Sequence, residues 1–421
     1  MVKNLFLLLI VTITFKNYSQ KPSEIGKNFI LTTFVNKDFE ISYSFFDQPL
    51  FKEFSISSLS EVVSQIESHV GPYKGVIEVN NESNIYYFYS EFENQKLDIT
   101  LTFNTENKII GFFFVPHKEF KKENFIGKEL NIKSGNLELN GTLLTPENDS
   151  LKKLVIFIHG SGPNDRDETI FENKPFKDVS ESLYKRGIAS YRFDKKVFSN
   201  PESFNDNSTI DEEITNDILD IINYFKNDNQ FSNYEIIILG HSLGAYLTPR
   251  IINKSNKVSK AIMLAGNARS LDKLIIEQYN YLYELNPTED LKNELGKLKN
   301  QIFLLHSKRF NLNTSKENLP LNLSANYWQS ILDYNPLKEG KKIKIPMLIL
   351  HGERDYQVTM KDFELWKKSL DNNKKATFIS YPKLNHLFIT GDKKSEPKEY
   401  MIKGTVDEMA INDIFNFIQK K

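Results

Sequence analysis

The architecture of this chain is decided by one stretch, Glu235-Ile236-Ile237-Ile238-Leu239-Gly240-His241-Ser242-Leu243-Gly244. It starts as a continuous apolar run, short enough for a strand that is buried on both faces of a parallel sheet, and an apolar segment of helical length follows it. Ser242 stands between the two, flanked by Gly240 and Gly244. At so sharp a strand-to-helix turn the backbone passes close to itself, so neighbours without bulk are needed. The stretch therefore predicts a nucleophile elbow that lifts the Ser242 hydroxyl above the sheet.

The segments around this elbow alternate between apolar strands and amphipathic helices. The apolar runs lie at 154–158, 188–193, 261–265, 345–351 and 376–381, the helical patterns at 179–186, 210–227 and 407–418, and an alternating strand at 137–144 leads into them. Alternation of this kind is typical of a parallel sheet with helices on both faces. We therefore expect a large α/β domain over residues 125–421.

The alternation stops between about residues 267 and 338. Leucine and isoleucine recur there at helical spacing, and Pro287 separates two helical patterns. A helical insertion between sheet strands lies over the carboxyl ends of the strands, where ligands bind. We interpret it as a helical cap, with a partner-binding helical hairpin as the alternative. Its aromatic residues fit either an apolar pocket or the core of the cap itself: Tyr279, Tyr281, Tyr283, Tyr327 and Trp328.

The preceding region has a different organisation. Residues 23–46 have a helical pattern, and a second helix is predicted to begin at a capping box, Ser58-Leu59-Ser60-Glu61, and to end at Gly71-Pro72. The period then changes to two, which predicts strands at 74–79, 84–91, 96–103 and 108–115. The sequence thus predicts a small α+β domain over residues 23–116. Its aromatic strands suit either a core or a binding face, so its partner is left open.

The first residues predict export. Lys3 precedes a largely apolar run over residues 5–15, and Ser19 offers a small residue for cleavage. The run is short for a membrane span, which takes about 20 residues. We therefore expect a signal peptide over residues 1–19, a mature chain without a membrane span, and a secreted or periplasmic protein.

Composition excludes several classes of protein. The 54 basic and 55 acidic residues leave a net charge of −1, so no global charge favours nucleic acid or an anionic membrane as partner. There is no cysteine, which rules out disulfides, thiolate metal sites and a cysteine nucleophile. Neither a metal-ligand spacing nor a phosphate-binding glycine loop is found, so no metal and no cofactor are expected.

A serine nucleophile needs a histidine base, and the base needs a carboxylate to orient it. Behind such an elbow these groups follow in the order Ser, Asp or Glu, His, each at the end of a strand. Of the histidines after Ser242, His306 falls in the predicted cap and His351 ends the strand that precedes the acid, which leaves His386. The leading acid is Asp355, directly after an apolar strand. Glu353 is the alternative, and Asp194 would break the order.

The oxyanion of a tetrahedral intermediate needs two N–H donors. One is predicted at Leu243, the residue after the nucleophile and the start of a helix. The other is expected from the glycine-rich loop His159-Gly160-Ser161-Gly162-Pro163, and Ser161 is the chosen donor. The charged run that follows, residues 165–168, is interpreted as a set of local ion pairs that hold this loop, with recognition of a polar substrate group as the alternative.

These motifs together resemble the bacterial alpha/beta hydrolases of the serine esterase type that carry an extra N-terminal domain. The residues that carry the resemblance are 159–168, 240–244, 352–358 and Asn385-His386. The first domain is similar, by pattern and position, to the cystatin-like or nuclear-transport-factor-like domains found ahead of such hydrolases. The resemblance implies a carboxylic ester hydrolase with Ser242, Asp355 and His386 as its triad.

We therefore expect an enzyme that cleaves small-molecule esters with short to medium acyl chains through an acyl-enzyme. A serine peptidase or amidase of the same fold is the nearest alternative, because nothing in the cap sequence excludes it. A binding protein that keeps the fold without the chemistry is the alternative from another class.

Overall fold

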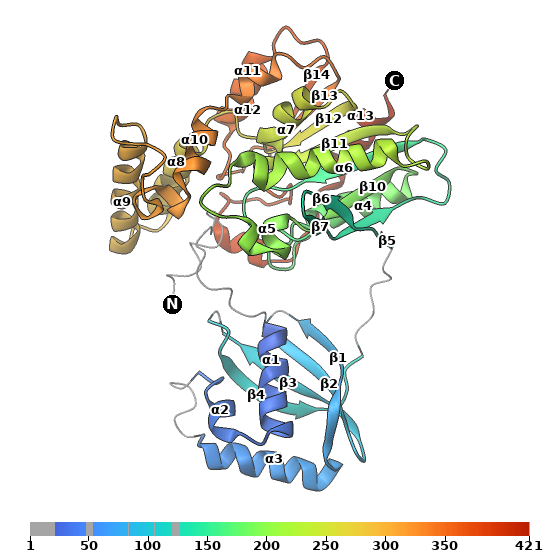
Figure 1. Ribbon diagram of the computed structural model, residues 1–421, viewed down its shortest axis with the longest axis vertical. Coiled ribbons are helices and arrows are strands. Elements are labelled where there is room, and N and C mark those ends of the chain that lie inside the picture. The colour runs from blue at the N-terminus through green and yellow to red at the C-terminus, as the bar shows by residue number, and fades with distance from the viewer. Residues whose placement is uncertain (1–21, 48–53, 83, 105, 120–126, 421) are drawn as a thin grey trace. The chain divides into compact units, whose positions relative to one another are not determined.

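The protein is described by a computed structural model, which covers residues 22–47, 54–82, 84–104, 106–119 and 127–420 (Figure 1). The chain divides into two compact units, one within Phe15–Phe125 and the other within Ile126–Lys421. The predicted signal peptide lies outside the described residues and stays a prediction. No helix in the described ranges is long and apolar enough to cross a membrane.

The N-terminal unit packs helices against a four-stranded antiparallel sheet of order β1-β2-β3-β4. Its helices are α1 (Pro22–Ile30), which continues into a π-helical turn (Leu31–Val35), α2 (Phe39–Tyr43) and α3 (Ile56–Val70). The strands are β1 (Tyr73–Glu82), β2 (Ile85–Phe92), β3 (Lys96–Phe103) and β4 (Ile109–Val115). Phenylalanines dominate the core, and Phe29, Phe46 and Phe88 have no exposed surface. From the sheet itself, Phe88, Phe92 and Phe103 belong to this core, each at most 2% exposed.

Helix α3 begins earlier than its sequence signature predicts. The side chain of Ser55, and not that of Ser58, caps it, because the N–H of Ser58 donates to Ser55 Oγ at 3.1 Å. Ser58 lies in the first turn of the helix. The capping box predicted at Ser58 is therefore wrong, since a run of serines offers several candidate caps and the local pattern does not choose among them.

The second unit is built on an eight-stranded sheet of order β14-β13-β12-β11-β9-β10-β8-β5. Its parallel strands are β9 (Lys153–Ile158), β10 (Ala189–Phe193), β11 (Glu235–His241), β12 (Val258–Leu264), β13 (Met347–Gly352) and β14 (Ala376–Tyr381). Strands β8 (Gly141–Leu144) and β5 (Lys128–Glu129) add an antiparallel edge. Strand β9 is buried throughout and strand β11 is buried after its exposed first residue, Glu235, as expected from their continuous apolar runs in the middle of the sheet.

The strand predicted at 137–144 is divided in the structure. Its first half, β7 (Leu137–Leu139), pairs with β6 (Ile132–Ser134) in a separate two-stranded sheet, whereas its second half is β8 of the large sheet. The carbonyl of Asn140, between the halves, accepts from the N–H of Asp194. The alternating pattern runs through both halves, so it does not reveal the change of partner.

Helices cover both faces of the sheet (Figure 1). One face packs against α4 (Pro175–Lys185) and α13 (Glu408–Gln419). The other packs against α6 (Asn216–Asn227), α7 (Leu243–Lys254) and α12 (Met360–Ser369). Each helix turns an apolar face to the sheet, which is the arrangement expected for alternating strands and helices. The parallel sheet with helices on both faces confirms the predicted fold class.

The predicted helical cap lies between β12 and β13. It contains α8 (Leu271–Leu285), α9 (Glu289–Leu305), α10 (Ala325–Leu332) and α11 (Pro336–Gly340). Thr288 caps α9, directly after Pro287. Tyr327 and Trp328 of α10 are buried in the core of the unit, which favours the core interpretation for these two aromatic residues.

Candidate active site

Ser242 sits at the turn between β11 and α7 in a strained backbone conformation, with φ 52° and ψ −117°. A non-glycine residue with positive φ is uncommon and needs support from its surroundings. The two glycines supply room for it. A Cβ on Gly240 would lie 2.6 Å from the carbonyl carbon of Gly244, and a Cβ on Gly244 would overlap the carbonyl oxygen of Ile158. The predicted elbow geometry is thus present in the chain.

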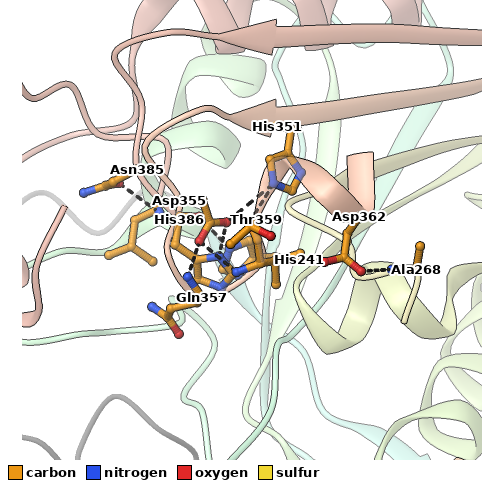
Figure 2. A network of polar contacts seen from close by, with 12 residues as sticks. His241, Ala268, His351, Asp355, Gln357, Thr359, Asp362, Asn385 and His386 are labelled. Carbon is orange, nitrogen blue, oxygen red and sulfur yellow. Dashed lines mark hydrogen bonds and ion pairs between the residues drawn. The ribbon is translucent and has the colours of Figure 1, made fainter. Parts of the chain in front are cut away.

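The predicted base and acid meet at the ends of neighbouring strands. The Nδ1 atom of His386 lies 2.6 Å from Asp355 Oδ2, and both residues are buried. The other carboxylate oxygen of Asp355 accepts from the N–H groups of Gln357 and Val358, at 2.8 and 3.0 Å. Figure 2 shows His241, Asp355 and His386 gathered at one place. The two backbone N–H groups fix one oxygen of the Asp355 carboxylate and so aim the other oxygen at His386.

The alternative acid and His306 lie elsewhere, whereas the Nε2 atom of His351 lies 3.9 Å from Asp355 Oδ2 (Figure 2). Glu353 is exposed and accepts from the hydroxyl of Ser380 at 2.8 Å. His351 is fully buried beneath the acid loop, where its Nε2 donates to the carbonyl of Val358 at 2.7 Å, and burial lowers its pKa. His306 pairs with Asp272 in the cap at 2.9 Å. The structure therefore brings His386, Asp355 and the elbow together, as the sequence predicts.

The loop after β9 passes directly beside the elbow. A Cβ on Gly160 would lie 3.2 Å from the Cβ of Ser242, a tighter contact than most Cβ atoms make, so the lack of a side chain eases this close approach. Ser161, the predicted oxyanion donor, follows it and lines the same hollow as Ser242 and His386. The N–H of Leu243 opens α7 and so has no acceptor within the helix. Both predicted donors thus border the nucleophile.

The charged run after this loop is paired throughout. The Asp165 side chain accepts from Thr169, Arg166 pairs with Asp194 and Glu129, Asp167 with Arg192, and Glu168 with His241. These contacts support the structural interpretation of the run and explain why Asp194 is not available as a catalytic acid.

A buried ion pair beneath the site was not anticipated from the sequence. The Nδ1 atom of His241 lies 2.9 Å from Glu168 Oε2, and its Nε2 lies 2.9 Å from the carbonyl oxygen of His386. Both ring nitrogens thus face acceptors, which favours the imidazolium form. Burial opposes charge on either partner, but their attraction outweighs it, so the pKa of His241 is raised and that of Glu168 is lowered. The only sequence signal was the glutamate after the glycine loop.

Two hollows meet at Ser242. The larger, about 250 Å³, is bordered by Ser242, His386, Phe171 and the glycine loop. The smaller, about 30 Å³, is bordered by Ser242, Leu243, Tyr246 and residues of the cap helix α8, Leu271 and Leu274. Ser161 and Gln357 contribute to both. A substrate carbonyl at Ser242 would therefore have its two substituents in different spaces.

Potential metal ligands do not cluster in the described ranges: no group of three or more His, Asp or Glu side chains there has the arrangement of a metal site. Three of the histidines near Ser242, namely His241, His351 and His386, already lie against carboxylates or backbone carbonyls.

Comparison with known proteins shows the family to which the chain belongs. Residues 149–393 match the family described as serine aminopeptidase, S33, and residues 28–112 match a family described as protein of unknown function (DUF3887). The chain is 30% identical over 401 residues to Esterase EstD of Thermotoga maritima, covering 92% of this chain and 93% of that protein. The chain therefore belongs to the serine aminopeptidase S33 family, and its fold is that of the alpha/beta hydrolases.

Several solved structures are similar at lower identity. Est1E from Butyrivibrio proteoclasticus is 19% identical with a TM-score of 0.47, over 70% of this chain and all of that one. An esterase from Pyrococcus furiosus is 16% identical with a TM-score of 0.45, over 70% of this chain and 91% of that one.

Proposed function

We propose that this protein hydrolyses carboxylic esters with short acyl chains through an acyl-enzyme on Ser242. The observation that carries the proposal is the contact of His386 Nδ1 with Asp355 Oδ2, on a histidine that borders the same hollow as the elbow serine. The relationship to Esterase EstD along nearly the whole chain supports an ester substrate.

In the proposed mechanism, Ser242 Oγ attacks the ester carbonyl while His386 Nε2 takes its proton. Asp355 holds the imidazole in the tautomer with hydrogen on Nδ1 and stabilises the imidazolium that forms. The N–H groups of Ser161 and Leu243 donate to the oxyanion. His386 then gives its proton to the departing alkoxide, and the alcohol leaves. Water, deprotonated by His386, attacks the acyl-enzyme; the bond to Ser242 Oγ then breaks, His386 returns the proton to Ser242, and the carboxylic acid is released.

The position of His386 indicates which hollow receives the alcohol part of the ester and which receives the acyl part. The imidazolium must reach the oxygen of the leaving alcohol, so the alcohol lies on the side of His386. That is the larger hollow, which His386 borders; the smaller one, without His386, is left for the acyl chain. A water molecule needs at least about 10–15 Å³ on the same measure, so a space of about 30 Å³ holds only a few heavy atoms. The acyl group is therefore short, and the alcohol is less restricted.

Amide hydrolysis is the second candidate, because the family takes its description from aminopeptidases. The same triad and oxyanion donors serve both bonds. The difference lies in the leaving group, since an amine must be protonated before it departs.

The test is the initial rate of hydrolysis of nitrophenyl esters of increasing acyl length beside matched nitroanilides, for wild type and Ser242→Ala. We expect acetate to butyrate esters to react best, anilides to react hardly at all and the variant to be inactive. Faster turnover of anilides would assign the amidase function. Equal, background rates for wild type and variant would make the protein a binding protein.

We also propose that the mature protein is exported, on the basis of the apolar run after Lys3. Expression in a bacterial host followed by cell fractionation and N-terminal sequencing tests this. A mature chain that begins near residue 20 and is found outside the cytoplasm supports export, and an intact Met1 on a cytoplasmic protein contradicts it.

A further inference from the structure

A buried lysine holds the peptide that carries the predicted oxyanion donor. Lys195 follows strand β10, and only 1% of its surface is exposed. Its ammonium donates to the carbonyl oxygen of Gly160 at 2.9 Å. A buried ammonium is costly unless it is paired and hydrogen-bonded, so a lysine at this position needs a structural or functional reason.

The geometry of the peptide bond connects this contact to catalysis. The Gly160 carbonyl and the Ser161 N–H belong to one planar trans peptide, in which the two groups point in opposite directions. Whatever fixes the carbonyl therefore fixes the N–H as well. The other peptide of Gly160 is fixed too, because its N–H donates to Glu168 Oε1 at 2.5 Å. Ions of opposite charge thus hold the loop on both sides of Gly160.

The charge of Lys195 is balanced by Glu213, which is equally buried and lies 2.7 Å from the ammonium. The hydroxyl of Tyr327, from the cap helix α10, donates to the other oxygen of Glu213 at 2.5 Å. Lys195 itself is tied down by its N–H, which donates to the carbonyl of Asn164 at 3.0 Å. The chain of contacts leads from the cap, through the ion pair, to the peptide of Ser161.

The amide of Asn164 also donates to the Gly160 carbonyl, at the longer distance of 3.2 Å. From this arrangement, and resting on the proposed function, we propose that Lys195 is a positioning residue of the oxyanion hole. Its ammonium directs the Ser161 N–H toward the developing oxyanion and, through the charge on the carbonyl, makes this N–H a stronger donor. Lys195 does not touch the substrate. Its contribution therefore appears in the transition state and in stable tetrahedral adducts, and much less in the binding of the planar ester.

The test compares two double variants, one that neutralises the buried pair of Lys195 and Glu213 and one that neutralises the neighbouring, partly buried pair of Lys196 and Asp217. Lys195→Met/Glu213→Gln removes the pair that reaches Gly160, and the amide of the new glutamine still accepts from Tyr327. Lys196→Met/Asp217→Asn is the matched control, because this neighbouring pair, 2.5 Å apart, contacts no residue of the glycine loop. The readouts are kcat and KM on nitrophenyl acetate, the affinity for a short alkylboronic acid, which forms a tetrahedral adduct on serine, and thermal unfolding.

We expect the first variant to lose kcat by about 10- to 100-fold, because removal of a whole oxyanion donor costs about 10²–10³-fold. KM should change little, and the affinity for the boronic acid should fall in parallel with kcat. The single variant Lys195→Arg, which keeps a positive charge, should have a higher kcat and a higher boronic acid affinity than the double variant. The control should keep its kcat and its boronic acid affinity. A folded Lys195→Met/Glu213→Gln protein with wild-type kcat and boronic acid affinity would overturn the proposal.

A measurement on the unmodified enzyme covers the case in which that variant does not fold. In wild type with ¹⁵N-labelled serine, the Ser161 amide proton should move downfield when the boronic acid binds, and an unmoved Ser161 signal would overturn the proposal. A wild type that neither cleaves esters nor binds the boronic acid would instead refute the proposed function, and this inference with it.

Discussion

The carboxylate of Asp355 is divided between two tasks: one oxygen accepts from backbone N–H groups of its own loop, and the other faces His386 Nδ1 at 2.6 Å. We expect Asp355→Asn to lower kcat by about 10⁴-fold with little loss of stability, because the amide keeps the loop contacts but disfavours the required imidazole tautomer. Steady-state kinetics on nitrophenyl acetate checks this. Glu353→Gln is the control, and a larger loss there than in Asp355→Asn would reassign the acid.

The elbow depends on the absence of a side chain at residue 244. Gly244→Ala places a methyl group against the carbonyl of Ile158, so we expect a loss of about 1–3 kcal/mol in the free energy of unfolding, together with most of the activity. Gly296→Ala in helix α9 is the matched control, because its Cβ meets open space. The control should gain up to about 1 kcal/mol from helix propensity. Urea unfolding measures both, and equal stabilities would contradict the steric argument.

The ion pair of Glu168 and His241 gives a pH dependence of defined sign. The lowered pKa of Glu168 means that its contribution is present above the unfolded value of 4.5 and is lost as the pH falls through the folded pKa. The raised pKa of His241 means that its contribution is present below the unfolded value of 6.5 and is lost as the pH rises through the folded pKa. The pair therefore stabilises the fold fully between these pH values.

Accordingly, Glu168→Gln should lower the free energy of unfolding by about 3–5 kcal/mol between pH 4.5 and 6.5, and by less at higher pH. Glutamine retains an acceptor for the Gly160 N–H, so the experiment isolates the charge. Urea unfolding across the pH range measures the difference. As a control, Glu129→Gln removes an exposed partner of Arg166 and should lower the free energy of unfolding by at most about 1 kcal/mol. A difference that does not vary with pH would show that His241 is neutral in the folded protein.

His159 makes the fold sensitive to acid. It is buried between Phe176 and Phe193, and burial lowers its pKa to about 4. The unfolded chain takes up this proton near pH 6.5 and the folded protein only near 4, so stability falls as the pH falls between these values. The loss amounts to about 3 kcal/mol. We expect His159→Phe to remove it, which a shallower dependence of urea unfolding on pH between 7 and 4 would show; an unchanged slope would contradict the assignment.

We expect the cap helix α8 to limit the length of the acyl chain. Leu274 is 3% exposed and borders the smaller hollow. Leu274→Ala enlarges this space, so we expect the ratio of kcat/KM for hexanoate over acetate esters to rise by about tenfold or more. Phe171→Ala, in the larger hollow, should leave the acyl preference unchanged and alter the preference among alcohols. If Phe171→Ala changed the acyl preference and Leu274→Ala changed the alcohol preference, the larger hollow would be the acyl site and the smaller one the alcohol site.

Local patterns in the sequence determined the architecture and the identity of the candidate residues. The glycines around Ser242 leave room for one backbone path, and the apolar runs before Ser242, Asp355 and His386 place these residues at the same edge of a parallel sheet. Chain order then separated His386 from His351 and His306. Local patterns predicted the structure less well where neighbouring residues offer alternatives of nearly equal energy. Examples are the choice of cap among the serines at the start of α3 and the choice of partner strand for residues 137–144.

The tertiary structure alone decided which charges meet. Lys195, Glu213 and Tyr327 are far apart in the sequence and carry no motif, and they meet because β10, the segment before α6 and the cap converge behind the glycine loop. The same holds for His241, whose charge depends on Glu168 and on a carbonyl 145 residues further along the chain. Periodicity reports which side of an element is buried. It does not report which buried polar groups face each other, because that is fixed by the packing of whole elements.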